Sequence, residues 1–267
     1  IALEQGDRAS ADTAVVSGAA AERAGGRLRT PYWLLLLVAA AAGGFLAAEL
    51  GTPPQPAALQ TAFRQLTEEP GLERQPTISP DGRTVVYVSE KRGKSDLYSL
   101  RVGGRNAVLL TPDSPDDDYA PAFSPDGNRI AFRSDRGSGG IYVMEATGES
   151  VRRIADFGFD PQWSPAGDEI VVADERVFDP MSRAVHSRIW AVRVSDGQKR
   201  LVADADGVGP RWSPGGRRIV FWGVRRDRRS ERDIFSVAAD GSEAEAPVPL
   251  SDDAAVDWSP TWSADGR

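Results

Sequence analysis

The chain has 267 residues, with 27 glycines, 19 prolines and no cysteine, and its formal net charge is −7. Without cysteine, disulfide bonds and thiol catalysis are excluded. From residue 51 onward the chain holds 34 acidic and 28 basic residues. This balance argues against nucleic-acid binding, which needs a basic face. The many glycines and prolines are typical of a turn-rich, mostly β, extracytoplasmic protein.

Residues 1–29 are polar and rich in alanine, glycine and charged side chains, without an apolar period. This composition predicts a flexible chain, and we interpret 1–29 as a cytoplasmic juxtamembrane segment. The first five residues, Ile1 to Gln5 (IALEQ), are similar to the closing helix of bacterial Ser/Thr protein kinase domains. Because the chain also begins without methionine, we expect a further domain upstream.

Residues 30–50 are predicted to form a transmembrane helix. From Thr30 to Ala48 there are 19 residues without a charge, and at about 1.5 Å each they span the roughly 30 Å of a bilayer's hydrocarbon core. Three arginines precede this segment and Glu49 follows it. The positive-inside rule therefore places 1–29 in the cytoplasm and the rest of the chain outside the bacterial inner membrane, in a single pass. A cleaved signal peptide ending near Ala48 is the alternative.

Residues 51–61 form a Pro-rich, semi-rigid linker, and five copies of one short phrase follow it. The copies are 76–82 (PTISPDG), 121–127 (PAFSPDG), 161–167 (PQWSPAG), 210–216 (PRWSPGG) and 260–266 (PTWSADG). Their serines lie 45, 40, 49 and 50 residues apart. This period is typical of propeller blades with four strands each.

Each copy predicts the same order of strands and turns. An apolar residue ends a short strand, and Ser-Pro-Asp-Gly then forms a tight turn in which proline sets φ and glycine adopts a positive φ. Runs rich in β-branched and aromatic residues predict second strands at 84–89, 129–134, 169–173 and 218–222, and third strands at 96–100, 140–144, 188–192 and 233–237. Several second strands are nearly continuously apolar, as expected for strands covered on both faces.

These phrases resemble the TolB-like propeller repeat, a relative of the WD-type repeat, and the resemblance covers residues 62–267. It implies an all-β fold, a β-propeller of four-stranded blades, which the transmembrane helix would precede. Four blades and the start of a fifth are visible, which is fewer than the family usually has, so we expect the propeller in this chain to be incomplete. The later copies depart from the phrase at Ala166, Gly215 and Ala264, which the turn tolerates.

Candidate catalytic and metal-binding residues are few. His186 is the only histidine, and its place in a polar loop favours an exposed side chain over a general base. Asp116, Asp117 and Asp118 lack the alternating ligands of a calcium loop, which favours a solvated acidic loop. The sequence has no HExxH, CxxC or phosphate-loop motif. We therefore predict no catalytic, cofactor-binding or metal site.

Two further groups of residues have both a functional and a structural interpretation. Residues 225–229 (RRDRR) could dock an anionic partner or lipid head groups, but the neighbouring acids favour a solvated loop. Trp163, Trp212 and Trp262 occupy the same position in their repeats. This equivalence favours core packing over a ligand cage.

Propellers bind through loops held on a rigid scaffold. We therefore predict a membrane-anchored sensing or protein-interaction module, with a protein or small-ligand partner at the propeller loops. The layout resembles receptor-type Ser/Thr kinases with a C-terminal propeller, which we prefer because of Ile1 to Gln5. The alternatives are the sensor of a membrane-bound winged-helix transcription regulator, a TolB-like periplasmic scaffold, or the propeller of a prolyl-oligopeptidase-like hydrolase. A homodimer is a hypothesis, because one helix signals most simply by association.

Overall fold

The structure is a computed structural model that describes residues 37, 39–41, 63, 65–68, 71–176, 186–224, 232–251 and 255–266. The chain divides into two compact units, Ile1–Ala62 and Phe63–Arg267. In the first unit the described residues, Leu37 and 39–41, are helical. No helix within the described part of the chain has the length and apolar composition needed to cross a membrane. The predicted segments 1–29 and 51–61, and nearly all of 30–50, lie outside the described residues.

The second unit is built from β-strands. The structure describes β1 (Glu73–Ile78), β2 (Thr84–Ser89), β3 (Asp96–Arg101), β4 (Val108–Leu109), β5 (Asp118–Phe123), β6 (Arg129–Ser134), β7 (Gly140–Glu145), β8 (Arg152–Ala155), β9 (Phe159–Trp163), β10 (Glu169–Ala173), β11 (Ile189–Arg193), β12 (Lys199–Ala203), β13 (Val208–Trp212), β14 (Arg218–Val224), β15 (Arg232–Ala238) and β16 (Val248–Pro249). The predicted second and third strands are confirmed, with ends that differ by two residues at most.

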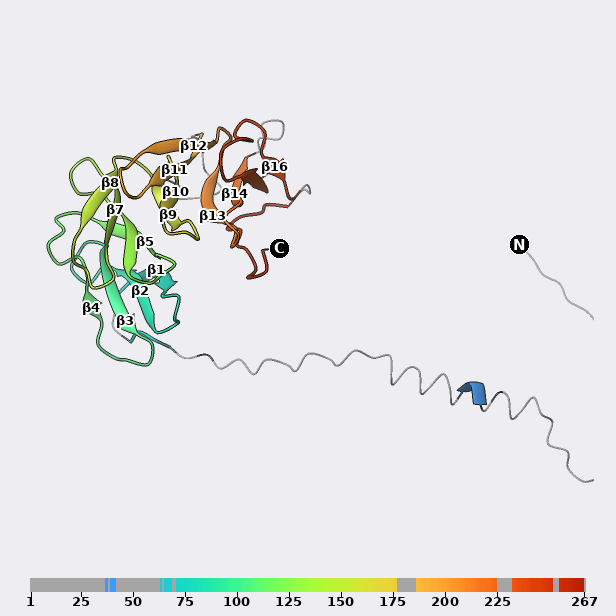
Figure 1. Ribbon diagram of the computed structural model, residues 1–267. Helices are drawn as coiled ribbons and strands as arrows, with labels where there is room; N and C mark the ends of the chain where they lie inside the picture. Colours follow the sequence, from blue (N-terminus) through green and yellow to red (C-terminus); the bar gives the residue numbers. More distant parts are fainter. Residues whose placement is uncertain are drawn as a thin grey trace, which may run out of the picture. The chain divides into compact units, whose positions relative to one another are not determined.

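These strands form four antiparallel sheets of four strands each, and within each sheet the strands lie in chain order. The first strands of neighbouring sheets contact one another, β1 with β5, β5 with β9, and β9 with β13. Figure 1 shows the sheets following one another around a curve, with these first strands on its inner side. This arrangement of four-stranded sheets is that of a β-propeller, and the predicted all-β fold class is confirmed.

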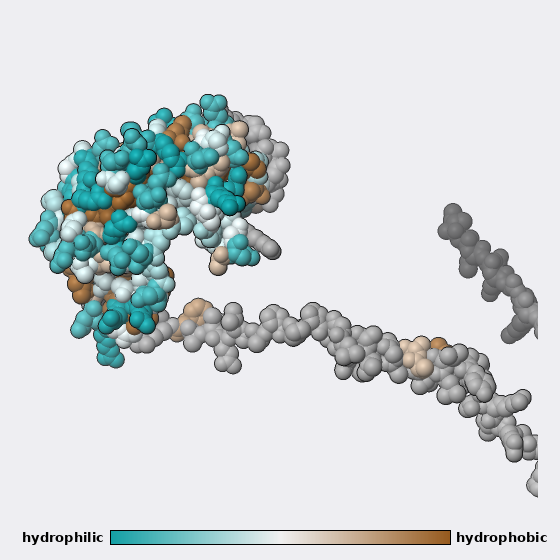
Figure 2. All heavy atoms as spheres, viewed as in Figure 1, coloured by the Kyte–Doolittle hydropathy of each residue, from teal (hydrophilic) through white to brown (hydrophobic). Residues whose placement is uncertain are grey.

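The second strand of each sheet forms the core between sheets. Val86 of β2 lies in one buried cluster with Phe132 of β6, and Val171 of β10 lies in another with Phe221 of β14. Full burial of one such side chain contributes roughly 1.5–3 kcal/mol. On the face shown in Figure 2, hydrophilic side chains predominate over the propeller unit and hydrophobic ones form small separate patches. The second strands are thus covered on both faces, as their apolar runs predict.

The Ser-Pro-Asp-Gly turns join the first and second strands through a repeated set of hydrogen bonds. Ser124 is fully buried, and its hydroxyl donates to Asp126 Oδ1 at 2.5 Å and accepts from the Arg129 N–H at 2.9 Å. The Gly127 N–H donates to the Ser124 carbonyl at 2.9 Å. The glycines that close the five turns have φ values between 70° and 78°, a region that favours glycine. Serine and glycine recur because this turn requires both.

The third turn lacks the aspartate, and a neighbouring residue takes its place. Ala166 occupies the aspartate position, and the Ser164 hydroxyl donates instead to Asp168 Oδ1 at 2.8 Å. The Gly167 N–H still donates to the Ser164 carbonyl at 2.9 Å. The departure at Ala166 is therefore tolerated because a carboxylate two residues later completes the same bond.

Candidate functional site

A left-handed residue occupies the same position in all five repeats, in the first strand of each of the four sheets and in the equivalent segment of the fifth copy. The residue directly before each repeated proline has a positive φ: Gln75 at 50°, Ala120 at 51°, Asp160 at 51°, Gly209 at 60° and Ser259 at 53°. The strand register shifts at this point in all four sheets. Four of the five positions hold a side chain, although a left-handed conformation costs roughly 1–2 kcal/mol there and residues before proline prefer extended backbone. These inner-strand bulges are thus strained positions that the surrounding fold must hold.

The bulges of the first two sheets are linked directly. The Gln75 Oε1 accepts a hydrogen bond from the Ala120 N–H at 3.0 Å. Ala120 has left-handed backbone, so its N–H is turned out of the regular ladder and takes a side-chain acceptor instead. The bulge residue of one sheet therefore supports the bulge of the next.

In the third sheet the bulge residue is an aspartate whose surroundings are unusual. Burial raises the pKa of Asp160, and the nearby Arg211 and Arg176 oppose this rise. Burial likewise lowers the pKa of Arg211, and Asp160 opposes that fall. The Arg211 Nη1 donates to the Pro210 carbonyl at 2.9 Å. No hydrogen bond joins the Asp160 carboxylate to another described residue.

A tyrosine extends this group to the second sheet. The Arg176 guanidinium lies 4.3 Å from the centre of the Tyr119 ring. The Tyr119 hydroxyl donates to Asp135 Oδ1 at 3.1 Å, and burial raises the pKa of Tyr119. Asp135 also accepts from Arg133 Nη2 at 3.0 Å.

We call Tyr119, Asp135, Asp160, Arg176 and Arg211 the inner-strand cluster. Three of its members lie on the contacting first strands β5, β9 and β13. The cluster offers two cations, two carboxylates and a phenol, which suits it to binding polar and charged groups. It contains no histidine, serine or cysteine that could form a nucleophile and base pair.

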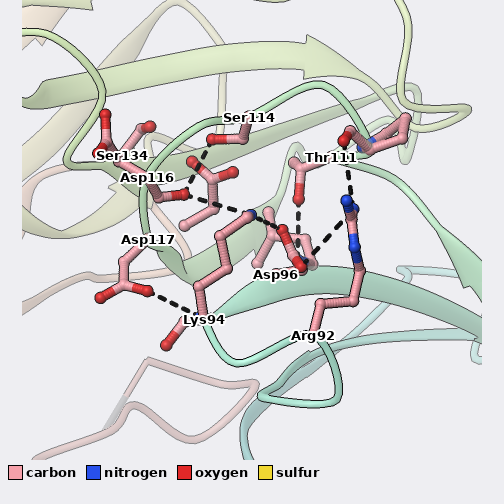
Figure 3. A network of polar contacts seen from close by, with 12 residues as sticks. Arg92, Lys94, Asp96, Thr111, Ser114, Asp116, Asp117 and Ser134 are labelled. Carbon is pink, nitrogen blue, oxygen red and sulfur yellow. Dashed lines mark hydrogen bonds and ion pairs between the residues drawn. The ribbon is translucent and has the colours of Figure 1, made fainter.

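The acidic run leads into β5, and Figure 3 shows its Asp116 and Asp117 beside Lys94. Asp116 and Asp117 are exposed, as predicted. Asp117 Oδ1 accepts from the Ser95 N–H at 2.7 Å. Asp118, however, is fully buried and accepts two hydrogen bonds from Arg136 Nη2, at 3.1 and 3.0 Å.

The prediction of a solvated loop is therefore wrong for Asp118, because an arginine distant in sequence satisfies its charge. Figure 3 also shows Lys94 next to Asp96, with which it forms an ion pair. Within the described ranges, no group of three or more histidine, aspartate or glutamate side chains could hold a metal ion. The run links the first sheet to the second through Asp117 and Ser95.

The other residues singled out in the sequence are an exposed histidine, core tryptophans and a basic run that lies outside the described residues. His186 is exposed. Residues 225–229 lie outside the described residues. Trp163 is buried in a cluster between sheets, and its Nε1 donates to the Ala122 carbonyl at 3.0 Å. Trp212 packs against the neighbouring cluster, so both tryptophans contribute to the core as predicted.

Sequence analysis missed the inner-strand cluster. Its members are far apart in the chain, and the repeat brings them together only after the sheets stack. One signal was present: the position four residues before each repeated serine holds a different residue in every copy, whereas the serine never varies. A variable position inside an invariant frame is where a repeat protein can carry function.

The comparisons with known proteins agree with this fold. Residues 57–184 match the family model of the TolB beta propeller domain. The uncharacterized protein Atu1656 of Agrobacterium fabrum is 31% identical over 154 residues, 54% of this chain and 52% of that protein. A TolB homolog of Chlorobium luteolum is 29% identical, over 54% of this chain and 32% of its own length. The uncharacterized peptidase YuxL of Bacillus subtilis is 26% identical, over 55% of this chain and 28% of its own length. The chain thus spans about half or less of the length of these curated relatives.

Solved structures show the same architecture. A putative TolB from Agrobacterium tumefaciens is similar with a TM-score of 0.61 and 25% identity, covering 76% of this chain and 70% of that one. TolB from Acinetobacter baumannii, at 18% identity, has a TM-score of 0.57, and the match covers 73% of this chain and 47% of that one. A Mycobacterium tuberculosis puromycin-hydrolyzing peptidase, at 19% identity, has a TM-score of 0.50, and the match covers 67% of this chain and 29% of that one. The last two likenesses concern the fold alone. The second unit of this chain is therefore a β-propeller, similar to the TolB beta propeller domain whose family model matches residues 57–184.

Proposed function

We propose that this chain is a binding module, and that its inner-strand cluster holds a polar segment of a protein partner. The observation that carries this proposal is the Asp160 carboxylate, which has raised pKa, two arginines nearby and no hydrogen bond within the described part of the chain. Perturbed titratable groups gather at functional sites more often than elsewhere. The likeness to proteins named TolB supports a protein partner, because TolB-like propellers mediate protein interactions.

The backbone beneath the cluster supports the same proposal. Asp160 sits on a left-handed bulge that every repeat maintains, and strain of this kind is concentrated where side chains must be aimed. A protein partner fits better than a small ligand. The cavity beside Arg211 measures about 230 Å³, below the roughly 300–1,000 Å³ of drug-sized ligand sites. We therefore propose that the partner binds at the inner strands rather than at the predicted propeller loops.

The experiment that tests this function selects peptides from a displayed random library on the full chain in detergent. Binding of a selected peptide is then measured by fluorescence anisotropy on Asp160→Asn and Arg211→Gln. We expect affinity to fall about tenfold or more in each, as for loss of a charge-assisted contact. Arg101→Gln, an exposed residue at the end of β3, is the matched control. Equal binding by all three variants would contradict the proposal.

The proposal includes a membrane anchor with the propeller outside the bacterial inner membrane. Its support is the uncharged stretch within 30–50 and the arginines at 23, 27 and 29. Protease added to intact spheroplasts should remove the propeller and spare 1–29. Protection of the propeller would contradict this placement. Crosslinking in the same membranes tests the homodimer. If the full chain and a chain without the propeller both stay monomeric, the homodimer is excluded.

For the whole protein we propose the sensor part of a receptor-type Ser/Thr kinase, supported by Ile1 to Gln5 alone. Genomic sequence upstream of Ile1 tests it. A Gly-rich loop, a strand lysine and His-Arg-Asp would support the kinase, whereas a winged helix would make the chain the sensor of a transcription regulator. If neither a kinase nor a winged helix is encoded upstream and the propeller is released from the membrane, a TolB-like periplasmic scaffold is favoured instead.

A second candidate function is the propeller of a peptidase. The observation that favours it is the likeness to YuxL, named a peptidase, and to the puromycin-hydrolyzing peptidase. In this case the catalytic residues would lie in a hydrolase domain outside residues 62–267. A Gly-x-Ser-x-Gly elbow encoded beyond Arg267 would support this candidate, and its absence there would exclude it.

A further inference from the structure

One arginine of the propeller bridges two successive Ser-Pro-Asp-Gly turns. Arg129 follows the second turn, and its Nη2 donates to the carbonyl of Gly167, the glycine of the third turn, at 3.0 Å. The Arg129 guanidinium also lies 4.5 Å from the centre of the ring of Trp163, the residue directly before the serine of that turn. The third turn therefore offers a guanidinium two contacts, a glycine carbonyl and an aromatic face.

The first two turns stack on one another as the second and third do. A Cβ atom on Gly127, in the second turn, would lie 3.4 Å from Pro80 Cδ of the first turn, and one on Gly167 would lie 3.7 Å from Pro125 Cδ. The same glycine-to-proline contact thus joins both pairs of turns. The two gaps have similar backbone walls and differ in the side chain that enters them.

The gap between the first two turns has no arginine of its own. Thr84 stands five residues after its turn serine, where the second copy has Arg129. A cavity of about 420 Å³ lies there, with Thr84, Phe123 and Gly127 among its walls. No hydrogen bond from a described residue reaches the Gly127 carbonyl, and no described cation lies over the Phe123 ring. Both kinds of contact that Arg129 makes with the third turn are therefore open at the second.

The charge of this cavity favours a cation. Its walls include the exposed side chains of Asp81 and Asp126, and no lysine or arginine is among its described walls. Asp81 Oδ1 accepts from Ser79 and from the Arg83 N–H, and no described residue donates to Asp81 Oδ2. Hydrogen bonds, first of all from serine, lower the pKa of both carboxylates. Both are therefore ionised at neutral pH.

A guanidinium matches these walls better than an ammonium does. It is planar and weakly hydrated, so it stacks on an aromatic ring while its N–H groups donate to oxygen, whereas the ammonium of lysine is a strongly hydrated point charge. We propose that the cavity between the first two turns binds an arginine side chain of a partner polypeptide, which donates to the Gly127 carbonyl and lies over Phe123. None of these wall residues belongs to the inner-strand cluster, so the inference goes beyond the function proposed there.

The test measures fluorescence anisotropy of a rhodamine-labelled Gly-Gly-Arg-Gly-Gly peptide added to the full chain in detergent. Matched peptides carry lysine or citrulline in place of arginine, and citrulline has nearly the shape of arginine without its charge. We expect the arginine peptide to bind, the lysine peptide to bind more weakly and the citrulline peptide not to bind. Absence of binding by the arginine peptide, or equal binding by the citrulline peptide, would overturn the inference.

Variants locate the binding in the cavity. Thr84→Arg places in the gap the side chain that the second copy already has, and it should lower the affinity about tenfold or more. Ser138→Arg adds the same charge in the exposed loop between β6 and β7 and should leave the affinity unchanged. Wild-type affinity in a folded Thr84→Arg variant, or an equal loss in Ser138→Arg, would overturn the inference.

Thermal unfolding of each variant checks that it is folded. If Thr84→Arg does not fold, Asp81→Asn provides the second test, because it keeps Oδ1 as the acceptor for Ser79 and removes one charge from the cavity. We expect Asp81→Asn to weaken binding about two- to fivefold, as for loss of one exposed ion pair. Unchanged binding in Asp81→Asn would contradict a cation site in this cavity.

Discussion

The turn that ends each inner strand and the bulge four residues before it both recur throughout the propeller, but they are held in different ways. The turn is held by its own residues: the Ser124 hydroxyl bonds Asp126 and the Arg129 N–H. The bulge is held from outside, as when Gln75 of the first sheet accepts from the Ala120 N–H of the second.

This difference determines which residues each place accepts. The turn needs a hydroxyl and a glycine, so serine and glycine stand in every copy. The bulge is imposed by the stacking of sheets and accepts glutamine, alanine, aspartate, glycine or serine. Its side chains are therefore free to differ in function, and the third copy uses that freedom to place Asp160 between the charges of Arg176 and Arg211. The turns therefore serve stability, and under the proposed function the bulges serve binding.

Ser124→Ala should have the largest effect. It removes a fully buried hydroxyl and leaves the part-buried Arg129 N–H without its side-chain acceptor, and we expect a loss of about 1–3 kcal/mol in the free energy of unfolding. Chemical denaturation measures it. Ser138→Ala removes an exposed hydroxyl that accepts from Arg153 and should change stability by less than about 0.5 kcal/mol. Equal effects of the two changes would break the distinction.

Asp168→Ala should cost less, about 0.5–1.5 kcal/mol, because the Ser164 hydroxyl loses an acceptor only partly shielded from water. Adding Ala166→Asp to this variant restores the aspartate of the first two turns. We expect the double variant to recover most of the lost stability in the same denaturation experiment. If it recovers none, the turn does not depend on a carboxylate.

Ala120→Gly should stabilise slightly. Glycine removes the strain of a φ of 51°, worth roughly 1–2 kcal/mol, but loses roughly 0.5–1 kcal/mol of backbone entropy. We expect a net gain of about 0.5 kcal/mol in the unfolding free energy, and a loss for the β-branched change Ala120→Val. A destabilised Ala120→Gly would mean that the bulge is not strained.

The pH dependence of stability should have opposite signs at the two places. Hydrogen bonds from Ser124 and Asn128 lower the pKa of Asp126, so its contribution is complete above an unfolded pKa of about 3.9 and disappears as pH falls through the folded value. Burial raises the pKa of Asp160. Stability then declines as pH rises from about 3.9 through its folded pKa.

Unfolding free energies measured from pH 3 to pH 7 on Asp126→Asn and Asp160→Asn test these signs. Asp126→Asn should flatten the acid-side loss, and Asp160→Asn should remove the decline with rising pH. The same slope in both variants would contradict the separate environments of turn and bulge.

The propeller was predictable from the sequence because its determinants are local. Turn residues and β-branched runs set the ends of β2, β6 and β10, which the structure places at the predicted residues. The inner-strand cluster was not predictable. Asp160 and Arg211 lie 51 residues apart, and their proximity depends on how two sheets stack. Asp118 was misjudged for the same reason, because its partner Arg136 lies in the loop between β6 and β7, 18 residues away.

The most direct test of the division between turns and bulges measures two quantities on two variants. Peptide affinity and unfolding free energy are determined for Asp160→Asn and for Ser124→Ala in the full chain. We predict that Asp160→Asn loses about tenfold or more in affinity for a library-selected peptide without losing stability, while Ser124→Ala loses stability and, at temperatures where it is folded, keeps its affinity. Loss of affinity in Ser124→Ala with none in Asp160→Asn would contradict the account.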